Sequence, residues 1–290
     1  MQRFALTGAA GYVAPRHMQA ILDTGNTLVA VLDPHDTLGV MDRYFPDAEC
    51  FSDEQLFLQF IRQSGIDYLT VCSPNHTHFQ HIMMGMQSGA NIICEKPLVI
   101  DPAQIQALQE LEHLHHRHIK TILQLRLLPA VQAIKNALAA DRAKHVVEVQ
   151  YITSRGKWYH HSWKGHDELS GGLVTNIGIH LFDLLIWLFG AVEDVAVHHR
   201  NPSSVQGNLW LERATVSWKL SIDPAELPAS ALKQGARTFR TIRIDGQECK
   251  LDDGLEGLHT QCYREILAGN GPGIADAAPS IQLCHKILHL

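Results

Sequence analysis

The sequence predicts an α/β protein of two domains, in which a parallel sheet wound with helices is followed by an α+β domain with a large, mainly antiparallel sheet. Two observations support this prediction. Up to about residue 125, short apolar segments alternate with helical segments at the spacing of β-α-β units. Beyond it, longer strands of alternating polarity are joined by turns. We therefore expect domains at residues 1–125 and 126–290.

The first domain begins with a strand, a glycine turn and a helix. Phe4–Leu6 is the predicted strand, and the turn GAAGYVA at residues 8–14 opens a helix with Met18, Ile21 and Leu22 on one face. The first glycine permits a tight turn, the second lets the backbone approach a pyrophosphate, and the helix N-terminus offers N–H groups to an anion. The turn residues expected at the cofactor are Gly8, Gly11, Tyr12 and Val13.

A second strand, Leu28–Leu32, ends in Asp33. An acidic residue at this distance accepts hydrogen bonds from adenosine ribose hydroxyls in a Rossmann dinucleotide-binding domain. Asp33 would repel a 2′-phosphate, and no Arg or Lys follows before Arg43, so the sequence favours NAD over NADP. Asp33 could equally open a turn with Pro34, which is compatible with cofactor binding.

The remaining segments of this domain continue the alternation. Further strands are predicted at Cys50–Phe51, Asp67–Cys72, Ala90–Cys94 and Lys120–Leu123. Helices are expected from a capping box at 52–55 to Gln63, up to Ser88 before Gly89, and from an N-cap at Asp101.

Ligands of an open parallel sheet bind at the carboxyl ends of its strands. The side chains that should meet the glycine turn there are Ser73, Pro74, Asn75, His78, Glu95 and Lys96. Lys96 can donate to a substrate oxygen and shifts its pKa when desolvated. Taken alone, it is more typical of a surface lysine.

The second domain is predicted to start with a helix at Ala130–Ala140. Later strands are expected at Val146–Ser154, Val192–His199, Asn208–Ile222, Thr238–Ile244 and Glu248–Leu251, with a turn at Asp245-Gly246. The expected helices are Ile177–Phe189, Leu258–Leu267 and Ala275–His289. An antiparallel sheet usually needs one face covered, which favours a homo-oligomer.

The most apolar helix carries the second group of polar residues. Asn176, His180 and Asp183 recur at helical spacing and lie on one side. In such surroundings His180 is either a core histidine with satisfied hydrogen bonds or a general base in a dry pocket, and the sequence alone leaves both open.

Composition excludes several classes of function. A formal charge of −6 and the lack of a basic stripe argue against nucleic acid as a partner. We expect no membrane-spanning segment and no signal peptide, and therefore a cytoplasmic protein. Six scattered cysteines give no zinc or redox pair, and the histidines at 113–118 end a predicted helix without acidic or cysteine partners. No metal site is predicted.

Together these motifs resemble one family. The glycine turn with His17, Asp33, the P-N-x-x-H ending at His78, the E-K-P of Glu95–Pro97 and the G-x-H-x-x-D ending at Asp183 are similar to the glucose-fructose oxidoreductase, inositol dehydrogenase and rhizopine catabolism (Gfo/Idh/MocA) family. The resemblance covers nearly the whole chain. Segments 122–126, 152–159 and 162–165 look like the group of bacterial UDP-N-acetylglucosaminuronate 3-dehydrogenases in that family.

The resemblance implies NAD-linked oxidation of a sugar C3 hydroxyl in the synthesis of lipopolysaccharide and O-antigen diamino-uronic acids. NADH could be recycled by 2-oxoglutarate, and an aminotransferase would use the product. It makes Lys96 and His180 the proton-handling pair beside Asn176, where many members have Asp, and implies a tetramer. The expected substrate-binding residues are Gln124, Arg126, Arg155, Trp158, Tyr159, Trp163, Lys164, Asn176 and His180.

Two other functions stay open. One is an NAD-linked dehydrogenase of a free polyol or monosaccharide, which turnover of free inositol or glucose would favour. The other is a non-catalytic sensor that binds the dinucleotide and regulates a partner protein. The presence of both Lys96 and His180 argues against the sensor.

Overall fold

The chain forms two compact units in a computed structural model that describes residues 1–35, 38–140, 142–249 and 256–290. The first unit comprises Met1–Gln124 and Gly257–Ala278, and the second comprises Leu125–Glu256 and Pro279–Leu290. The predicted domains of 1–125 and 126–290 differ from this division by one residue at the first boundary and in the assignment of the tail. The tail segment Gly257–Ala278 belongs to the first unit, so the chain returns to that unit near its end.

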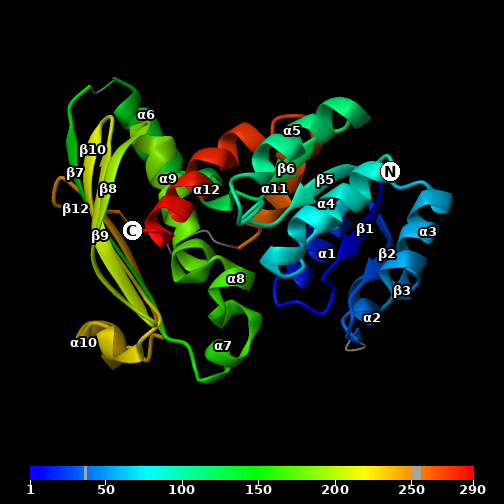
Figure 1. The fold of residues 1–290 in the computed structure, drawn as a ribbon, viewed down its shortest axis with the longest axis horizontal. Helices are drawn as coiled ribbons and strands as arrows, with labels where there is room; N and C mark the ends of the chain where they lie inside the picture. Colours follow the sequence, from blue (N-terminus) through cyan, green and yellow to red (C-terminus); the bar gives the residue numbers. More distant parts are fainter. Residues whose placement is uncertain (36–37, 141, 250–255) are drawn as a thin grey trace. The chain divides into compact units, whose positions relative to one another are not determined.

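The first unit is built on a six-stranded parallel sheet of order β3-β2-β1-β4-β5-β6 (Figure 1). Its strands are β1 (Arg3–Thr7), β2 (Thr27–Leu32), β3 (Glu49–Phe51), β4 (Tyr68–Val71), β5 (Asn91–Cys94) and β6 (Ile119–Thr121). Its helices are α1 (Ala14–Asp23), α2 (Met41–Tyr44), α3 (Glu54–Ser64), α4 (His78–Gln87), α5 (Gln104–His115) and α11 (Leu258–Leu267). The strand order reverses between β1 and β4, which is the switch point where ligands bind.

Three local predictions in this unit need correction. Asp53, not Ser52, caps α3, because its Oδ1 accepts hydrogen bonds from the N–H groups of Gln55 and Leu56 at 2.8 and 2.9 Å. Asp101 accepts from Ala103 N, so it closes a turn before α5 begins at Gln104. Leu22 on α1 is 45% exposed and does not join the buried face of Met18 and Ile21.

The tail segment is held to the first unit by polar and aromatic contacts. Thr260 Oγ1 on α11 donates to Asp23 Oδ2 on α1 at 2.8 Å. Lys120 Nζ donates to Gly271 O at 2.8 Å, and the Tyr263 ring stacks on Phe4 with centroids 5.9 Å apart. The tail thus completes the packing of β1 and α1.

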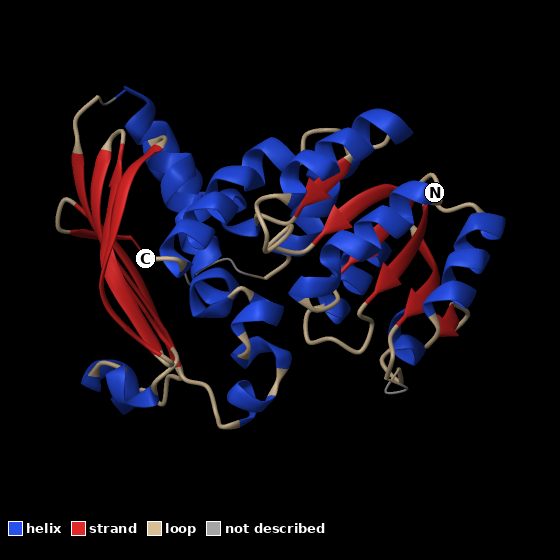
Figure 2. Cartoon of the chain, in the orientation of Figure 1, coloured by secondary structure: helices blue, strands red, loops and turns tan. Residues whose placement is uncertain are grey.

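The second unit contains one twisted six-stranded sheet of order β12-β11-β7-β10-β9-β8 (Figure 2). Its strands are β7 (His145–Thr153), β8 (Val192–Asn201), β9 (Ser204–Leu211), β10 (Ala214–Ser221), β11 (Thr238–Ile244) and β12 (Gln247–Cys249). Only β7 and β10 among these strands pair in parallel, which confirms the predicted mainly antiparallel sheet. The predicted strand Asn208–Ile222 is instead a hairpin of β9 and β10, and Lys250 and Leu251 of another predicted strand lie outside the described residues.

The helices of this unit are α6 (Pro129–Ala140), α7 (Trp158–His161), α8 (Asp167–Ser170), α9 (Ile179–Phe189) and α10 (Ala229–Lys233). α12 (Ile274–Leu288) crosses the boundary between the units. α9 packs on the sheet through Phe182, whose ring meets Trp218 edge-on at 5.3 Å. The helical stretch 167–189 is long and apolar enough to cross a membrane by length and composition, contrary to the expectation above. Its most apolar window is 72% buried, which is typical of a core helix.

Gly207 in β9 offers a test of this packing. A Cβ there would lie 2.0 Å from Ala196 O and 2.8 Å from Trp218 Cζ2. We expect Gly207→Ala to lower the free energy of unfolding by about 1–3 kcal/mol through overpacking. Urea unfolding followed by tryptophan fluorescence measures it.

The matched control is Gly39→Ala, because a Cβ at Gly39 meets no atom within 4 Å. Its free energy of unfolding should stay within about 0.5 kcal/mol of wild type. Equal stability of the two variants would contradict the packing described for β9.

Candidate active site

The glycine turn lies against the carboxyl end of β4, at the switch point of the first sheet. Gly8 has a φ of +82°, and a Cβ there would lie 2.5 Å from Ser73 N and 2.6 Å from Cys72 O. A Cβ on Gly11 would lie 2.9 Å from Gly8 O. Both positions need glycine, as a backbone that closely approaches a pyrophosphate does. The turn therefore fits a dinucleotide.

Asp33 braces this turn from the end of β2. Its Oδ2 accepts from Ala10 N and its Oδ1 from His35 N, both at 2.9 Å. Each carboxylate oxygen has a further lone pair, so ribose hydroxyls could still donate to it. The same side chain thus supports the turn and fits the predicted cofactor contact. Tyr12 and Val13 follow in the chain, and Tyr12 is exposed.

The segment after β4 is tied to the E-K-P segment by His78. Its Nδ1 lies 2.7 Å from Pro97 O and its Nε2 2.9 Å from Ser73 O, and the residue is 1% exposed. His78 was predicted to bind the cofactor, but the structure gives its ring internal partners. The buried His78 ring lies between the segment after β4 and the E-K-P segment, and it contacts a carbonyl oxygen of each. Pro74 is half-buried and Asn75 is buried beside it.

Glu95 also differs from the prediction. Its carboxylate was expected at the cofactor, yet Oε1 lies 3.1 Å from His17 Nε2 and 3.0 Å from His259 Nε2, and Oε2 accepts from Lys96 N at 3.1 Å. Lys96 itself is half-buried and follows directly. The Glu95 side chain is therefore directed into the first unit, and Lys96, the next residue, provides the amino group of the E-K-P motif.

The second unit presents Asn176 and His180 from one helical stretch. A π-helical turn at Val174–Gly178 leads into α9, and such turns are frequent at functional sites. From Val174 to Leu185, Asn176 and His180 are the two residues that are not buried. Asn176 Nδ2 donates to the Tyr159 hydroxyl at 2.9 Å. This helical stretch is thus buried except at Asn176 and His180, which stay partly accessible.

Cationic and aromatic side chains lie together after β7. Lys164 Nζ lies 5.7 Å from the Trp158 ring centroid and 5.5 Å from that of Trp163. Burial and the nearby Arg155 guanidinium lower the pKa of Lys164. Two like charges in partly buried surroundings repel each other, and an anion between them would relieve that repulsion. Such a cluster suits a phosphate or carboxylate ligand.

Arg126 was predicted to bind the substrate, but its guanidinium already has an acidic partner. Nε donates to Asp183 Oδ2 at 3.0 Å and Nη2 to Oδ1 at 2.6 Å, a bidentate pair. The two side chains are only 12% and 4% exposed. Asp183, which was predicted to share a helix face with Asn176 and His180, therefore has a structural role as the partner of Arg126. Gln124, another predicted substrate contact, has an Oε1 without a hydrogen-bond partner among the described residues.

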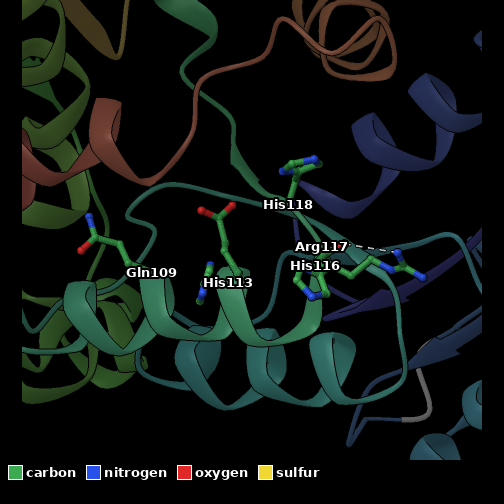
Figure 3. A pocket seen from close by; sticks show the side chains of 6 residues that line it. Gln109, His113, His116, Arg117 and His118 are labelled. Atoms are coloured by element: carbon green, nitrogen blue, oxygen red, sulfur yellow. Dashed lines mark hydrogen bonds between the residues drawn. The ribbon is translucent and has the colours of Figure 1, made fainter.

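Three of the four histidines at 113–118 line a hollow at the other end of the first sheet, together with Glu112. Figure 3 shows His113, His116 and His118 with Gln109 and Arg117 around it. His118 precedes β6, so the hollow lies at the amino ends of parallel strands, away from the edge where ligands bind. Within the described residues, the group spaced closely enough to hold a metal ion is His17, Glu95 and His259, not these histidines.

Comparisons with known proteins match parts of both units. The GFO_IDH_MocA description "Oxidoreductase family, NAD-binding Rossmann fold" matches residues 2–122, and "Oxidoreductase family, C-terminal alpha/beta domain" matches residues 145–227. The chain belongs to the GFO_IDH_MocA oxidoreductase family. Its first unit is accordingly an NAD-binding Rossmann domain.

Among solved structures, the WlbA (WbpB) dehydrogenase from Thermus thermophilus, in complex with NAD and UDP-GlcNAcA, is 46% identical with a TM-score of 0.97. The alignment covers 100% of this chain and 95% of that one. The same enzyme with NAD and alpha-ketoglutarate is 48% identical with a TM-score of 0.94, over 97% of this chain and 93% of that one. A curated relative, D-glucoside 3-dehydrogenase of Escherichia coli, is 26% identical over 68% of this chain, and the match spans 57% of its length.

In this family member the predicted site residues fall into two groups. The glycine turn, Asp33, the segment 73–78 and Lys96 belong to the first unit, whereas Asn176, His180 and the Arg155–Lys164 cluster belong to the second. Sequence reasoning missed His259 and Tyr263 because they follow Glu95 by more than 160 residues without any local motif. His17 was noticed as part of the family motif, but without a role.

The Arg126–Asp183 pair generates a stability prediction. We expect Asp183→Asn to destabilise the oxidoreductase by about 3–5 kcal/mol, because a nearly buried guanidinium loses its counter-charge. Chemical denaturation at pH 7 measures the loss. The matched control is Asp194→Asn, whose exposed pair with Lys286 is screened by solvent and should contribute little to stability. A loss no larger than that of the control would contradict a structural role for Asp183.

Proposed function

We propose that this chain uses NAD to oxidise the C3 hydroxyl of UDP-N-acetylglucosaminuronic acid (UDP-GlcNAcA) to a ketone. The observation that carries the proposal is the 46% identity, over the full chain, to a dehydrogenase solved with NAD and UDP-GlcNAcA. The chemistry of the second unit supports it. Arg155 and Lys164 can pair with a diphosphate or a uronate, and the indoles beside Lys164 can stack on uracil or sugar.

The first unit holds the cofactor in this proposal. The glycine turn and the N-terminus of α1 would hold the pyrophosphate, and Asp33 would accept from the ribose hydroxyls. The N–H groups of Gly8 and Gly11 themselves shape the turn, because they donate to Leu32 O at 2.8 Å and to Gly8 O at 3.0 Å. Bound NAD supplies the acceptor for the hydride that leaves C3. The hydroxyl proton must leave at the same time, so the protein has to provide a base and a donor that stabilises the developing alkoxide.

Lys96 and His180 fill these two roles. Asn176 is a neutral neighbour, so it can orient His180 by a hydrogen bond but cannot stabilise an imidazolium by charge. A neutral neighbour leaves an imidazole less basic, which assigns more of the proton transfer to Lys96. The products are the 3-keto sugar nucleotide, NADH and a proton.

Further parts of the proposal follow from the same relative. Its complex with NAD and alpha-ketoglutarate supports recycling of NADH by 2-oxoglutarate, which would be reduced to 2-hydroxyglutarate. A 3-keto sugar is a substrate for an aminotransferase, which places the chain in the synthesis of lipopolysaccharide or O-antigen diamino sugars. We propose a cytoplasmic homotetramer that is joined through the second sheet.

The test is NADH formation by the purified protein with NAD and UDP-GlcNAcA. Absorbance at 340 nm should rise, or 2-hydroxyglutarate should accumulate when 2-oxoglutarate is supplied. Free inositol, free glucose and UDP-N-acetylglucosamine are the comparison substrates. Turnover of a free sugar without turnover of UDP-GlcNAcA would replace the proposal by a polyol or monosaccharide dehydrogenase. Bound cofactor without any turnover would favour the sensor.

Substitution of the proton-handling residues gives a second prediction. Lys96→Ala and His180→Ala should each lower kcat by about 10²–10⁴-fold, the usual loss for a general acid or base. Circular dichroism should show an unchanged fold. Lys144→Ala, which removes an exposed lysine paired with Glu193, is the matched control with wild-type kcat. Wild-type kcat in both active-site variants would contradict the assignment.

A further inference from the structure

A chain of buried polar side chains connects four elements of the first unit. Glu95 after β5 contacts His17 on α1 and His259 on α11, and His17 Nδ1 lies 2.9 Å from the Tyr263 hydroxyl. The Tyr263 hydroxyl in turn lies 2.9 Å from Thr70 Oγ1 on β4. All five residues are buried, and His17, Thr70 and Tyr263 have no exposed surface.

The protonation states of this network fix the direction of each bond. Burial alone would raise the pKa of Glu95, but the hydrogen bonds that it accepts from the two histidines hold it well below its usual range, so Glu95 is a carboxylate. Burial lowers the pKa of His17, so its ring is neutral at pH 7. Because a carboxylate only accepts, His17 donates from Nε2 and accepts at Nδ1 from Tyr263. Burial raises the pKa of Tyr263, which keeps its hydroxyl protonated.

The far end of the network is the backbone of Lys96. Both oxygens of Glu95 are used: Oε1 accepts from the two histidines and Oε2 from Lys96 N. On the other side of Lys96, the Pro97 carbonyl oxygen lies 2.7 Å from His78 Nδ1. The Lys96 backbone is therefore held by the Glu95 carboxylate, and the residue that follows it lies against His78.

We propose that Glu95, His17 and His259 are positioning residues, which hold Lys96 at the geometry that proton transfer requires. This inference rests on the proposed function of Lys96. It assigns a role to the tail helix α11, which supplies His259 and Tyr263 to a site that the family's motifs place near the N-terminus. Displacement of a reacting group by about 1 Å lowers rates by roughly 10²-fold. Loss of the hydrogen bond between Lys96 N and the Glu95 carboxylate would therefore lower turnover if it shifted the lysine.

Glu95→Gln tests the role of the carboxylate. Glutamine keeps one acceptor but turns an N–H donor toward either Lys96 N or a histidine, so one bond of the network is lost. We expect kcat to fall about 10- to 100-fold, with the Kd for NAD and the KM for the sugar nucleotide within about threefold of wild type. Hydrogen exchange at the Lys96 amide should accelerate.

His259 provides a second variant that leaves the sheet intact. His259→Gln retains an N–H donor for Glu95, so kcat and the exchange rate of the Lys96 amide should stay within about threefold of wild type. His259→Leu removes the donor and should reproduce the effects of Glu95→Gln. The matched control is His145→Asn, which changes a buried histidine paired with Asp245 in the second unit. It should leave kcat unchanged.

Three results would overturn the inference. The first is a wild-type Lys96 exchange rate in both Glu95→Gln and His259→Leu. The second is a weakened Kd for NAD with unchanged kcat, which would make Glu95 a cofactor ligand. The third is about one equivalent of zinc or iron in the purified protein, since two histidines and a carboxylate can bind such ions. Amide exchange needs no substrate, so a failure of the proposed sugar-nucleotide oxidation is distinguishable from a failure of this inference.

Discussion

The buried carboxylate of Glu95 is the constraint on which the first unit depends. Transfer of an ionised carboxylate from water into a protein interior costs several kcal/mol unless hydrogen bonds replace the lost hydration. Here two imidazoles and a backbone N–H replace it, and they come from α1, α11 and the residue next in the chain. The tail must therefore fold back onto the first sheet, which explains why Gly257–Ala278 belongs to a unit that otherwise ends at Gln124.

The second unit uses the same physical solution in another form. Asp183 lies within the most apolar helix of the protein, and its bidentate pair with Arg126 anchors α9 to the segment that begins the unit. With that carboxylate satisfied, Asn176 and His180 are the polar positions of the stretch that stay partly accessible. In each unit, an acidic residue of a sequence motif is paired inside the protein, and the basic residue proposed for proton transfer is partly accessible.

The sequence predicted the features that depend on local periodicity. The alternation of strands and helices, the glycine turn, Asp33 and the apolar helix carrying His180 all lie within short windows of the chain. It could not predict which partner a charged side chain would choose. From the sequence, Arg126 was expected to bind a substrate, but in the structure it pairs with Asp183, which lies 57 residues away in the chain. His259 lies 164 residues from Glu95, so no local pattern could connect them. Ser52 and Asp53 are both residue types that can cap a helix, so the sequence alone could not decide between them. The structure shows that Asp53 is the cap.

The neutral side chain of Asn176 determines the direction of its hydrogen bond with Tyr159. A carboxylate at this position, as in many members of the family, would accept a hydrogen bond from Tyr159 and could stabilise a charged His180. The amide instead donates to the Tyr159 hydroxyl, whose own proton is then directed toward another acceptor. Burial raises the pKa of Tyr159, so this hydroxyl stays protonated and remains a donor. An oxidation that generates an alkoxide would benefit from such a donor. In the first unit, the Glu95 carboxylate supports the Lys96 backbone by accepting from its N–H, so both proposed parts of the site depend on a hydrogen bond to a motif residue.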